Sequence, residues 1–503
     1  MARRPESPVL ACGSVLSFHR DARGVGRLRP FATPCYTRSI WPVRRSFFWR
    51  QNEWVEGLFP SFIKAERARG GRIDSIHGVP RFVGELPASQ RQADLLRRAL
   101  GLFGLALVAA TWRLWTAQHV FPQVPFFYVM DGVPDACQWA GAAAMILGLA
   151  GAALAPGGSR RAPGSLLLFA VATLVMILLD QQRLQPWAYQ FVLAAVVLAL
   201  ADARGALPLL RLLVISFYFH SAVTKFDHSF LHTLGQQFLG ALAGASLDGW
   251  SESVRVAAAA VFPVGELLVA ITLCFARTRT AGLAGAVLLH VLLLAILGPW
   301  GLDHKPGVLL WNGYFIAQDI LLFSRGQAQP AADPAGKAVA PWPVRAMIWA
   351  AALLPFLGPT TWFDMWPSWG LYASAAQRVQ LLVHRRELEQ LPQELRQVTV
   401  ASSEADDPWL TVRLDRWALA ALGAPIYPQS RSQLGVAEAV IVRYGLVHRV
   451  RLYRFDLADR WSGQREYELF TTLPKILAAS GEYLFNSRPR QGRFAPRGEK
   501  PAT

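Results

Sequence analysis

The sequence predicts a membrane all-α fold, a polytopic bundle of about nine transmembrane helices followed by a small extracytoplasmic α+β or β-rich domain. Three observations lead to this prediction. The 503 residues are 53% hydrophobic and only 17% charged, whereas roughly a quarter of a soluble domain is charged. The apolar residues form blocks of roughly 17 to 20, the length that crosses a bilayer. After about residue 360 they instead alternate with polar residues, as they do in strands.

The first 88 residues are expected to form a basic, disordered extension rich in Arg, Pro and Gly, or to reflect a start codon placed too far upstream. Residues 1–100 hold 18 Lys and Arg against 8 Asp and Glu, within a net charge of +17 for the chain. No short apolar stretch lies near Met1, so no cleavable signal peptide is predicted. The basic residues flank membrane segments, which favours a role in topology. We therefore expect the lipid bilayer as a partner, and no nucleic acid.

The helical domain is expected over residues 89–360, in an inner cell membrane. Its candidate spans are 99–118, 137–155, 164–180, 186–201, 207–224, 256–276, 281–298, 307–324 and 343–359. If all nine cross, alternate loops collect cations such as Arg160, Arg161 and Arg277, and the opposite loops collect Asp131, Asp180 and similar acids. Because cytoplasmic loops carry the excess of Lys and Arg, the N-terminus is predicted cytoplasmic and the C-terminal domain extracytoplasmic.

The C-terminal domain is predicted over residues 361–490, with a disordered tail at 491–503. Strands are predicted at Arg378–His384, Trp409–Leu414, Arg449–Phe455 and Glu466–Thr471, which are rich in Val, Leu and Tyr. Gln433–Tyr444 predicts an amphipathic helix that ends at Gly445. A protein partner of this domain is one expectation.

The densest polar cluster in the chain follows the fifth apolar segment. It consists of His220, Ser221, Thr224, Lys225, Asp227, His228 and His232. If the helix continues, Ser221, Lys225, His228 and His232 share one face, because their spacing is 4, 3 and 4. A lysine at a membrane edge often extends to the headgroups, but this does not explain the neighbouring histidines. A lysine removed from water can lose its proton and act as a base.

Other ionisable groups lie deeper in apolar segments, where they are costly and usually face a cavity or a partner. Glu266 and His290 lie in sequential segments and could meet, either in a structural hydrogen bond or in a proton relay. Asn312 and Asp319 are seven residues apart and share a face of the eighth segment. These residues are the candidates for substrate contact or proton relay, and they suggest a polar cavity that opens outward.

Metal and disulfide chemistry have weaker signals. Asp227, His228 and His232 have an i,i+4 histidine pair, but H-E-x-x-H is absent, so no metal site is predicted. The four cysteines form no C-x-x-C pair, which argues against a dithiol redox motif.

Residues Ile215–Leu239 resemble the vitamin K-dependent gamma-carboxylase superfamily, which includes the bacterial HTTM (horizontally transferred transmembrane) proteins. The resemblance rests on an aromatic helix end, a small residue, then Lys, an apolar residue and Asp, here Tyr218-Phe219, Ala222 and Lys225-Phe226-Asp227. It extends over roughly residues 95–390 and includes His290 and Trp366–Tyr372. It implies membrane helices before an extracytoplasmic β-rich domain, with Lys225 as a base that deprotonates a reduced quinone. Thr224 stands where the animal enzymes have a second lysine.

The chain is also similar to the DoxX-like membrane proteins, which share a lysine helix end and a later membrane glutamate, here Glu266, and which are linked to thiol or quinone redox chemistry. Three functions remain open. The first is an enzyme on a lipid-soluble small molecule, with Lys225 as base and Asp227, His228, His232 and His220 tuning or relaying protons. The second is a non-catalytic scaffold that recruits a partner through residues 361–490. The third is a carrier with Glu266 and His290 on its path. No cofactor is indicated beyond a reduced quinone as possible substrate.

Overall fold

The computed structural model describes residues 87–324, 340–372, 374–401, 407–446 and 449–491. The expected N-terminal extension and the C-terminal tail lie almost wholly outside these ranges. From Leu86 on, the described residues belong to one compact unit, which is mostly helical and carries a small antiparallel sheet.

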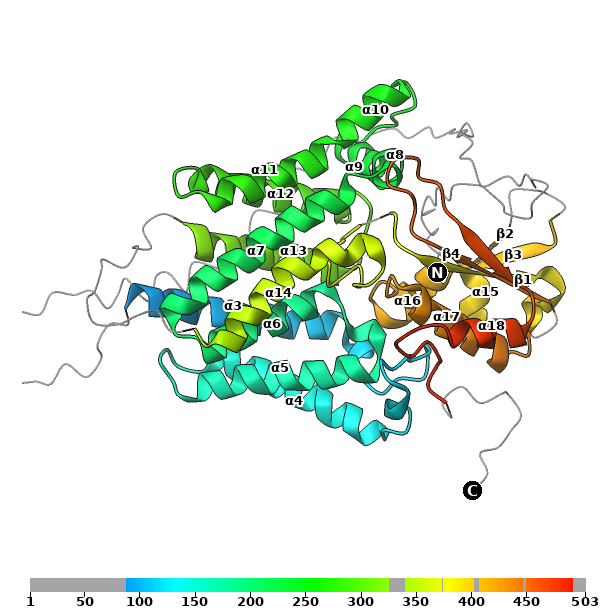
Figure 1. Ribbon diagram of the computed structural model, residues 1–503, viewed down its shortest axis with the longest axis horizontal. Helices are drawn as coiled ribbons and strands as arrows, with labels where there is room; N and C mark the ends of the chain where they lie inside the picture. The colour runs from blue at the N-terminus through cyan, green and yellow to red at the C-terminus, as the bar shows by residue number, and fades with distance from the viewer. Residues whose placement is uncertain (1–86, 325–339, 373, 402–406, 447–448, 492–503) are drawn as a thin grey trace, which may run out of the picture. The chain divides into compact units, whose positions relative to one another are not determined.

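Helices coincide with all nine predicted apolar segments (Figure 1). They are α3 (Ala88–Ala110), α4 (Asp135–Leu154), α5 (Arg161–Leu179), α6 (Pro186–Leu200), α7 (Ala203–Lys225), α10 (Glu252–Ala259) with α11 (Val261–Cys274), α12 (Arg279–Leu297), α13 (Pro306–Phe323) and α14 (Trp342–Leu353). Two short helices, α8 (His228–His232) and α9 (Leu234–Ala243), follow α7.

Five of these segments are long and apolar enough to cross a membrane, within the described residues: α4, α5, α7, the continuous Glu252–Cys274 and α12. The prediction of nine spans is therefore not confirmed. α6 is apolar but has only 15 residues, and α14 has only 12. α13 carries Asn312, Gln318 and Asp319 within 18 residues, which lowers its hydropathy.

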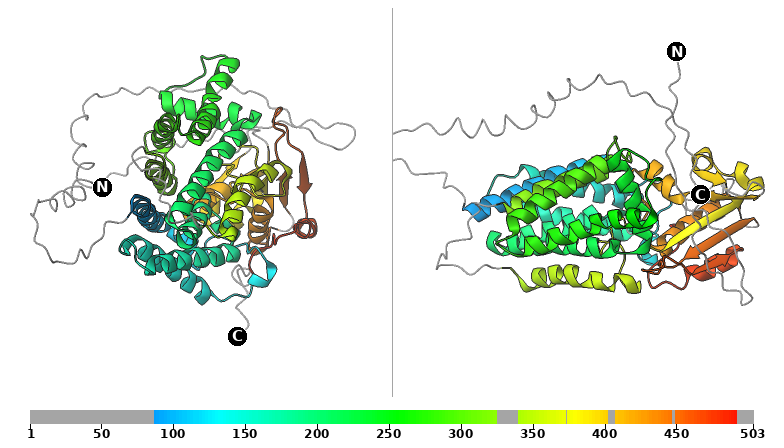
Figure 2. Two further views of the ribbon diagram at one scale, coloured as in Figure 1. Left: turned by 60° about the vertical axis from the view of Figure 1, so that its left-hand side comes forward. Right: turned by 90° about the horizontal axis from the view of Figure 1, so that it is seen from above.

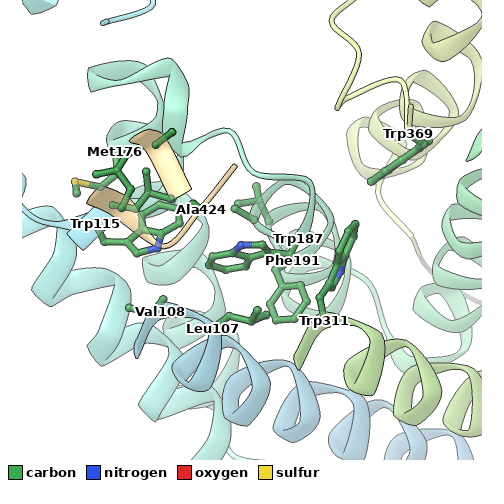
Figure 3. Packing of buried hydrophobic residues seen from close by; sticks show 14 of the residues in the cluster. Leu107, Val108, Trp115, Met176, Trp187, Phe191, Trp311, Trp369 and Ala424 are labelled. Atoms are coloured by element: carbon green, nitrogen blue, oxygen red, sulfur yellow. The ribbon is translucent and has the colours of Figure 1, made fainter. Parts of the chain in front are cut away.

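Close helix packing depends on small residues at the crossings. A Cβ at Gly101 of α3 would meet the backbone nitrogen of Ala153 at 2.6 Å, and one at Gly148 of α4 would meet that of Phe169 at 2.6 Å. Small residues let helix backbones approach in a membrane, where van der Waals packing replaces the hydrophobic effect. Beside these crossings, Trp115, Trp187, Phe191 and Trp311 fill the interior (Figure 3).

The C-terminal half contains a five-stranded antiparallel sheet of order β2-β3-β1-β4-β5. The strands are β1 (Arg378–His384), β2 (Thr399–Ala401), β3 (Trp409–Val412), β4 (Val450–Phe455) and β5 (Tyr467–Phe470). The helices of this half are α15 (Gln393–Gln397), α16 (Leu414–Leu422), α17 (Ser430–Arg443) and α18 (Leu473–Ser480). The predicted mixture of strands and helices is thus present after residue 360, within the same compact unit as the long helices. β2 is the strand that the pattern missed. Figure 2 shows the strands and the long helices from two further sides.

Helix α17 is buried along nearly its whole length and packs against β1 and β4. A Cβ at Gly435 would meet the carbonyl oxygen of Ser487 at 2.5 Å and a methyl of Val124 at 2.9 Å. Val124 precedes α4 and Ser487 follows α18, so α17 contacts both the helical region and the chain end. The two halves therefore share a packed interior.

Candidate functional site

Helix α7 places three polar side chains on one buried face, because Tyr218, Ser221 and Lys225 are spaced by 3 and 4 residues. They are 1%, 2% and 3% exposed. The neighbouring α11 packs against this helix (Figure 1). The polar face therefore points into the protein and away from lipid.

Lys225 forms an ion pair with Glu266 of α11. Its Nζ lies 2.8 Å from Oε1 and 2.8 Å from Oε2 of Glu266, and donates to Ser221 Oγ at 2.6 Å. The side chains are 3% and 9% exposed. All three ammonium protons thus have acceptors, which a buried charge requires. Both residues were predicted from the sequence as candidate site residues. However, Glu266 was expected to meet His290, and Lys225 was expected to share a helix face with His228 and His232.

A second polar cluster surrounds Tyr218. Its hydroxyl lies 2.7 Å from His290 Nε2 of α12 and 2.5 Å from Asp319 Oδ2 of α13. His290 Nδ1 lies 2.8 Å from Asn312 Oδ1. The structure therefore brings together three of the four predicted relay residues, through a tyrosine that the sequence analysis treated only as part of an aromatic run.

Glu266 and His290 do not bond to each other directly. The two clusters are nevertheless neighbours, because Tyr218 and Lys225 lie two turns apart on the same face of α7. A further buried polar contact lies nearby, in which Trp311 Nε1 donates to Gln190 Oε1 at 2.7 Å.

The predicted continuation of the Lys225 helix is wrong. α7 ends at Lys225, and Phe226 has non-helical angles of φ −76° and ψ 62°. Asp227 then begins α8, where its Oδ1 accepts from the Phe230 backbone N–H at 2.7 Å. An aspartate at this position is a strong N-cap, and it separates His228 and His232 from the face of Lys225.

His228 and His232 stack on each other at 3.8 Å between ring centres. His232 Nε2 lies 3.5 Å from Glu252, and a Cβ at Gly463 would meet His228 Nδ1 at 2.5 Å. Gly463 has φ +68°, which favours glycine, so the loop after β4 can lie against His228. Neither histidine makes a hydrogen bond or ion pair with Lys225 among the described residues.

The pKa values of the α8 residues follow from burial. Desolvation raises the pKa of Asp227, although Arg460 and Arg465 act against it. Desolvation, and next the charge of His232, lower the pKa of His228. His220, the last predicted catalytic residue, places Nε2 2.8 Å from the Ala352 carbonyl and donates to it, and it joins α7 to α14. These contacts are structural.

The polar turn after α5 proved to be a docking surface for the C-terminal half. Gln182 Oε1 accepts from the Tyr427 backbone N–H at 2.8 Å, and Arg431 donates to Gln181 Oε1 at 2.9 Å. Arg183, fully buried, donates to the Leu114 carbonyl at 2.8 Å. The side chains of this turn therefore hold the C-terminal half against the helices.

The outward-facing cavity at Lys225 stays a prediction. A pocket of about 360 Å³ lies between Phe127, Tyr128 and Leu484, and a much smaller one adjoins Gly358. Neither is lined by Lys225 or Glu266. No group of three or more metal-ligating side chains occurs in the part of the chain that the structure describes.

Comparison of the chain with family models, with curated proteins and with solved structures gave no match. The function must therefore be argued from the two polar clusters themselves.

Proposed function

We propose that this protein is a membrane enzyme that removes a proton from a lipid-soluble substrate, with Lys225 as the base and Glu266 as its proton partner. The observation that carries this proposal is the buried bidentate pair, in which Lys225 Nζ lies 2.8 Å from both oxygens of Glu266. The resemblance to the carboxylase and HTTM proteins points to the same lysine. It suggests a reduced quinone as the first substrate to test.

The pair is suited to proton transfer because its total charge is zero in two forms. If the proton moves from Lys225 to Glu266, an ion pair becomes an amine and a carboxylic acid, and no net charge is left in the low-dielectric interior. The neutral amine can then accept a substrate proton. Ser221, at 2.6 Å, keeps the amine in place in both forms.

The location of the pair also supports a lipid-soluble substrate. Helix α11 exposes Val264, Leu268 and Ile271 by 42%, 56% and 46%, while its Glu266 is turned inward. Such an apolar outer face suits contact with lipid. A hydrophobic molecule in the bilayer therefore comes within one helix thickness of Lys225, on the α11 side.

The direct test is the oxidation of a reduced quinone by dioxygen, which yields quinone and hydrogen peroxide, with the full chain in lipid vesicles. Lys225→Arg is the decisive variant, because arginine keeps the positive charge beside Glu266 but does not lose its proton. We expect turnover to fall about 10²- to 10⁴-fold, the usual contribution of a general base. Lys475→Arg changes an exposed lysine and should leave turnover unchanged.

Full turnover in Lys225→Arg would overturn Lys225 as the base. Turnover by the wild-type protein no faster than in protein-free vesicles would exclude a reduced quinone as the substrate.

A scaffold function is the second candidate, and the observation that favours it is the presence of large, strongly exposed apolar side chains in the C-terminal half. Trp362 and Trp461 are 88% and 78% exposed, and Leu484 is 93% exposed. Exposed apolar groups of this size often mark interaction sites. Under this alternative, a stoichiometric partner would co-purify with the wild type and be lost in Trp461→Ser, while Lys225→Arg would retain it.

A further inference from the structure

A continuous chain of hydrogen bonds crosses three helices beside the Lys225–Glu266 pair. It runs from Asp319 of α13 to Tyr218 of α7, then to His290 of α12 and back to Asn312 of α13. The successive distances are 2.5, 2.7 and 2.8 Å. All four residues are 5% exposed or less, so the protein itself must satisfy their polar atoms.

The direction of each bond can be assigned from the Asn312 end. Asn312 Nδ2 donates to the Val308 carbonyl at 2.8 Å, which turns Oδ1 toward His290. An amide oxygen only accepts, so His290 Nδ1 carries a proton. In a neutral imidazole the other nitrogen, Nε2, is then an acceptor, and the Tyr218 hydroxyl donates to it.

The state of Asp319 follows from the same accounting. An ionised Asp319 would accept the Tyr218 proton at Oδ2. Once Tyr218 donates to a neutral His290 instead, its oxygen can only accept, and the short contact to Asp319 needs a proton on the carboxyl. Asp319 is fully buried, and its Oδ1 has no hydrogen-bond partner in the described part of the chain. An ionised carboxylate with so few partners in the membrane interior is very costly, whereas a neutral carboxylic acid tolerates one unbonded carbonyl oxygen.

We propose that Asp319 stores a proton as a neutral carboxylic acid and that Tyr218 relays it to His290. In the transfer, the Tyr218 O–H bond breaks as His290 Nε2 gains its proton, and the Asp319 O–H bond breaks as Tyr218 is reprotonated. The products are an Asp319 carboxylate and a His290 imidazolium, with Tyr218 unchanged.

Two charged groups lie beside this relay, Lys225 of α7 and Glu266 of α11, which form the ion pair described above. Tyr218 and Lys225 lie on one face of α7, so a proton delivered to His290 changes the charge close to the Lys225–Glu266 pair. The use of this proton in catalysis rests on the proposed function, but the protonation state of Asp319 does not.

The test is infrared spectroscopy of the full chain in vesicles at neutral pH, read in the carbonyl stretch of protonated carboxylic acids. The wild type should show a band that is lost in Asp319→Asn. In Tyr218→Phe the band should move to higher frequency, because the acid no longer donates to a phenol oxygen. Asp415→Asn is the matched control, since Asp415 is held ionised by Arg413 at 2.9 Å, and it should leave the band unchanged.

Identical wild-type and Asp319→Asn spectra in this region would overturn the stored proton. A band that does not move in Tyr218→Phe would overturn the relay. Nitrogen-15 NMR of the His290 ring, assigned by its loss in His290→Gln, gives an independent result: one protonated nitrogen is expected, and two would contradict the assignment. These readouts do not depend on turnover, so the relay and the Lys225 base can fail separately.

Discussion

Two buried ion pairs of the molecule share the same charges but not the same surroundings. Lys225–Glu266 lies between α7 and α11, with side chains 3% and 9% exposed. Arg431–Asp364 lies between α17 and the segment before β1, with side chains 8% and 15% exposed. Burial alone therefore does not distinguish them, and the difference lies in what else each pair contacts.

The Arg431–Asp364 pair is locked by its neighbours. Arg431 donates to both oxygens of Asp364 and to Gln181, and Tyr427 donates to Asp364. The guanidinium also lies 5.3 Å from the centre of the Phe485 ring. Burial alone would lower the pKa of Arg431, but the hydrogen bonds and charge of Asp364 raise it overall. This pair cannot exchange a proton, and the further bond from Arg431 to Gln181 joins the C-terminal half to the helices.

The Lys225–Glu266 pair has the opposite character. Lysine loses its proton when its surroundings favour the neutral form, which arginine does not do. The Tyr218 cluster, which holds further exchangeable protons, lies beside it. Two properties thus separate a candidate catalytic ion pair from a structural one. Its base is a lysine, which can lose a proton, and other titratable groups lie next to it.

The largest effect on folding is expected at the structural pair. Asp364→Ala leaves the Arg431 charge buried without a partner, which costs about 3–5 kcal/mol of unfolding free energy. Denaturant unfolding of the purified protein measures this loss. Glu468→Gln removes an exposed partner of Arg454 and should cost at most about 1 kcal/mol. Equal, small losses in both variants would mean that the buried Arg431–Asp364 pair stabilises the fold no more than the exposed pair does.

The second prediction concerns whether Lys225–Glu266 is needed for folding. Glu266→Leu alone leaves a buried ammonium and should cost about 3 kcal/mol or more, whereas Lys225→Met with Glu266→Leu should recover most of that loss, because apolar residues replace both charges. A double-mutant cycle measured by unfolding gives the coupling. A double variant less stable than either single variant would show that the pair is a structural element like Arg431–Asp364.

The third prediction uses Asp180, one residue beyond α5. Burial raises its pKa from 3.8 to about 6, although Arg183 acts against this. Because the folded state holds this proton more tightly than the unfolded state, stability should fall as pH rises from about 4 to about 6, by about 3 kcal/mol. Unfolding measured across this window should show a flatter pH dependence in Asp180→Asn. An unchanged slope would mean that other groups set the pH dependence.

The smallest effect is expected at Arg460, which caps the end of α7 from the loop after β4. It donates to the carbonyls of Phe226 and Val223 at 2.9 and 2.8 Å, and its own carbonyl accepts from the His228 N–H at 2.8 Å. Arg460→Ala should cost about 1 kcal/mol of stability, with Arg460→Lys in between. If Arg460→Ala lowers the turnover of the folded protein, the loop also positions Lys225.

Much of the secondary structure could be predicted from local pattern. β1 begins and ends at the predicted residues, because Arg378–His384 is rich in Val and Leu and is bounded by polar residues. The end of α7 was missed although Asp227 carries a strong capping signal, because the helical spacing of the histidines favoured continuation. The nine spans are not confirmed, because α6 and α14 are short and α13 carries polar residues that lower its hydropathy.

The site was predicted in its residues but not in its pairing. Lys225, Glu266, His290 and Asp319 were each identified as polar groups in apolar segments, which is a local property. Which of them meet depends on how α7, α11, α12 and α13 face one another, and that is set by packing over distances that a sequence pattern does not contain. Tyr218 was missed because a tyrosine in an aromatic run is typical of packing.

The most direct test of the central claim is reduced-quinone turnover by the Lys225→Met, Glu266→Leu double variant, measured beside its unfolding free energy. If the pair is the catalytic acid–base site, the double variant stays folded, with stability close to that of the wild type, and loses turnover about 10²-fold or more. A folded double variant that oxidises the quinone at the wild-type rate would contradict the account.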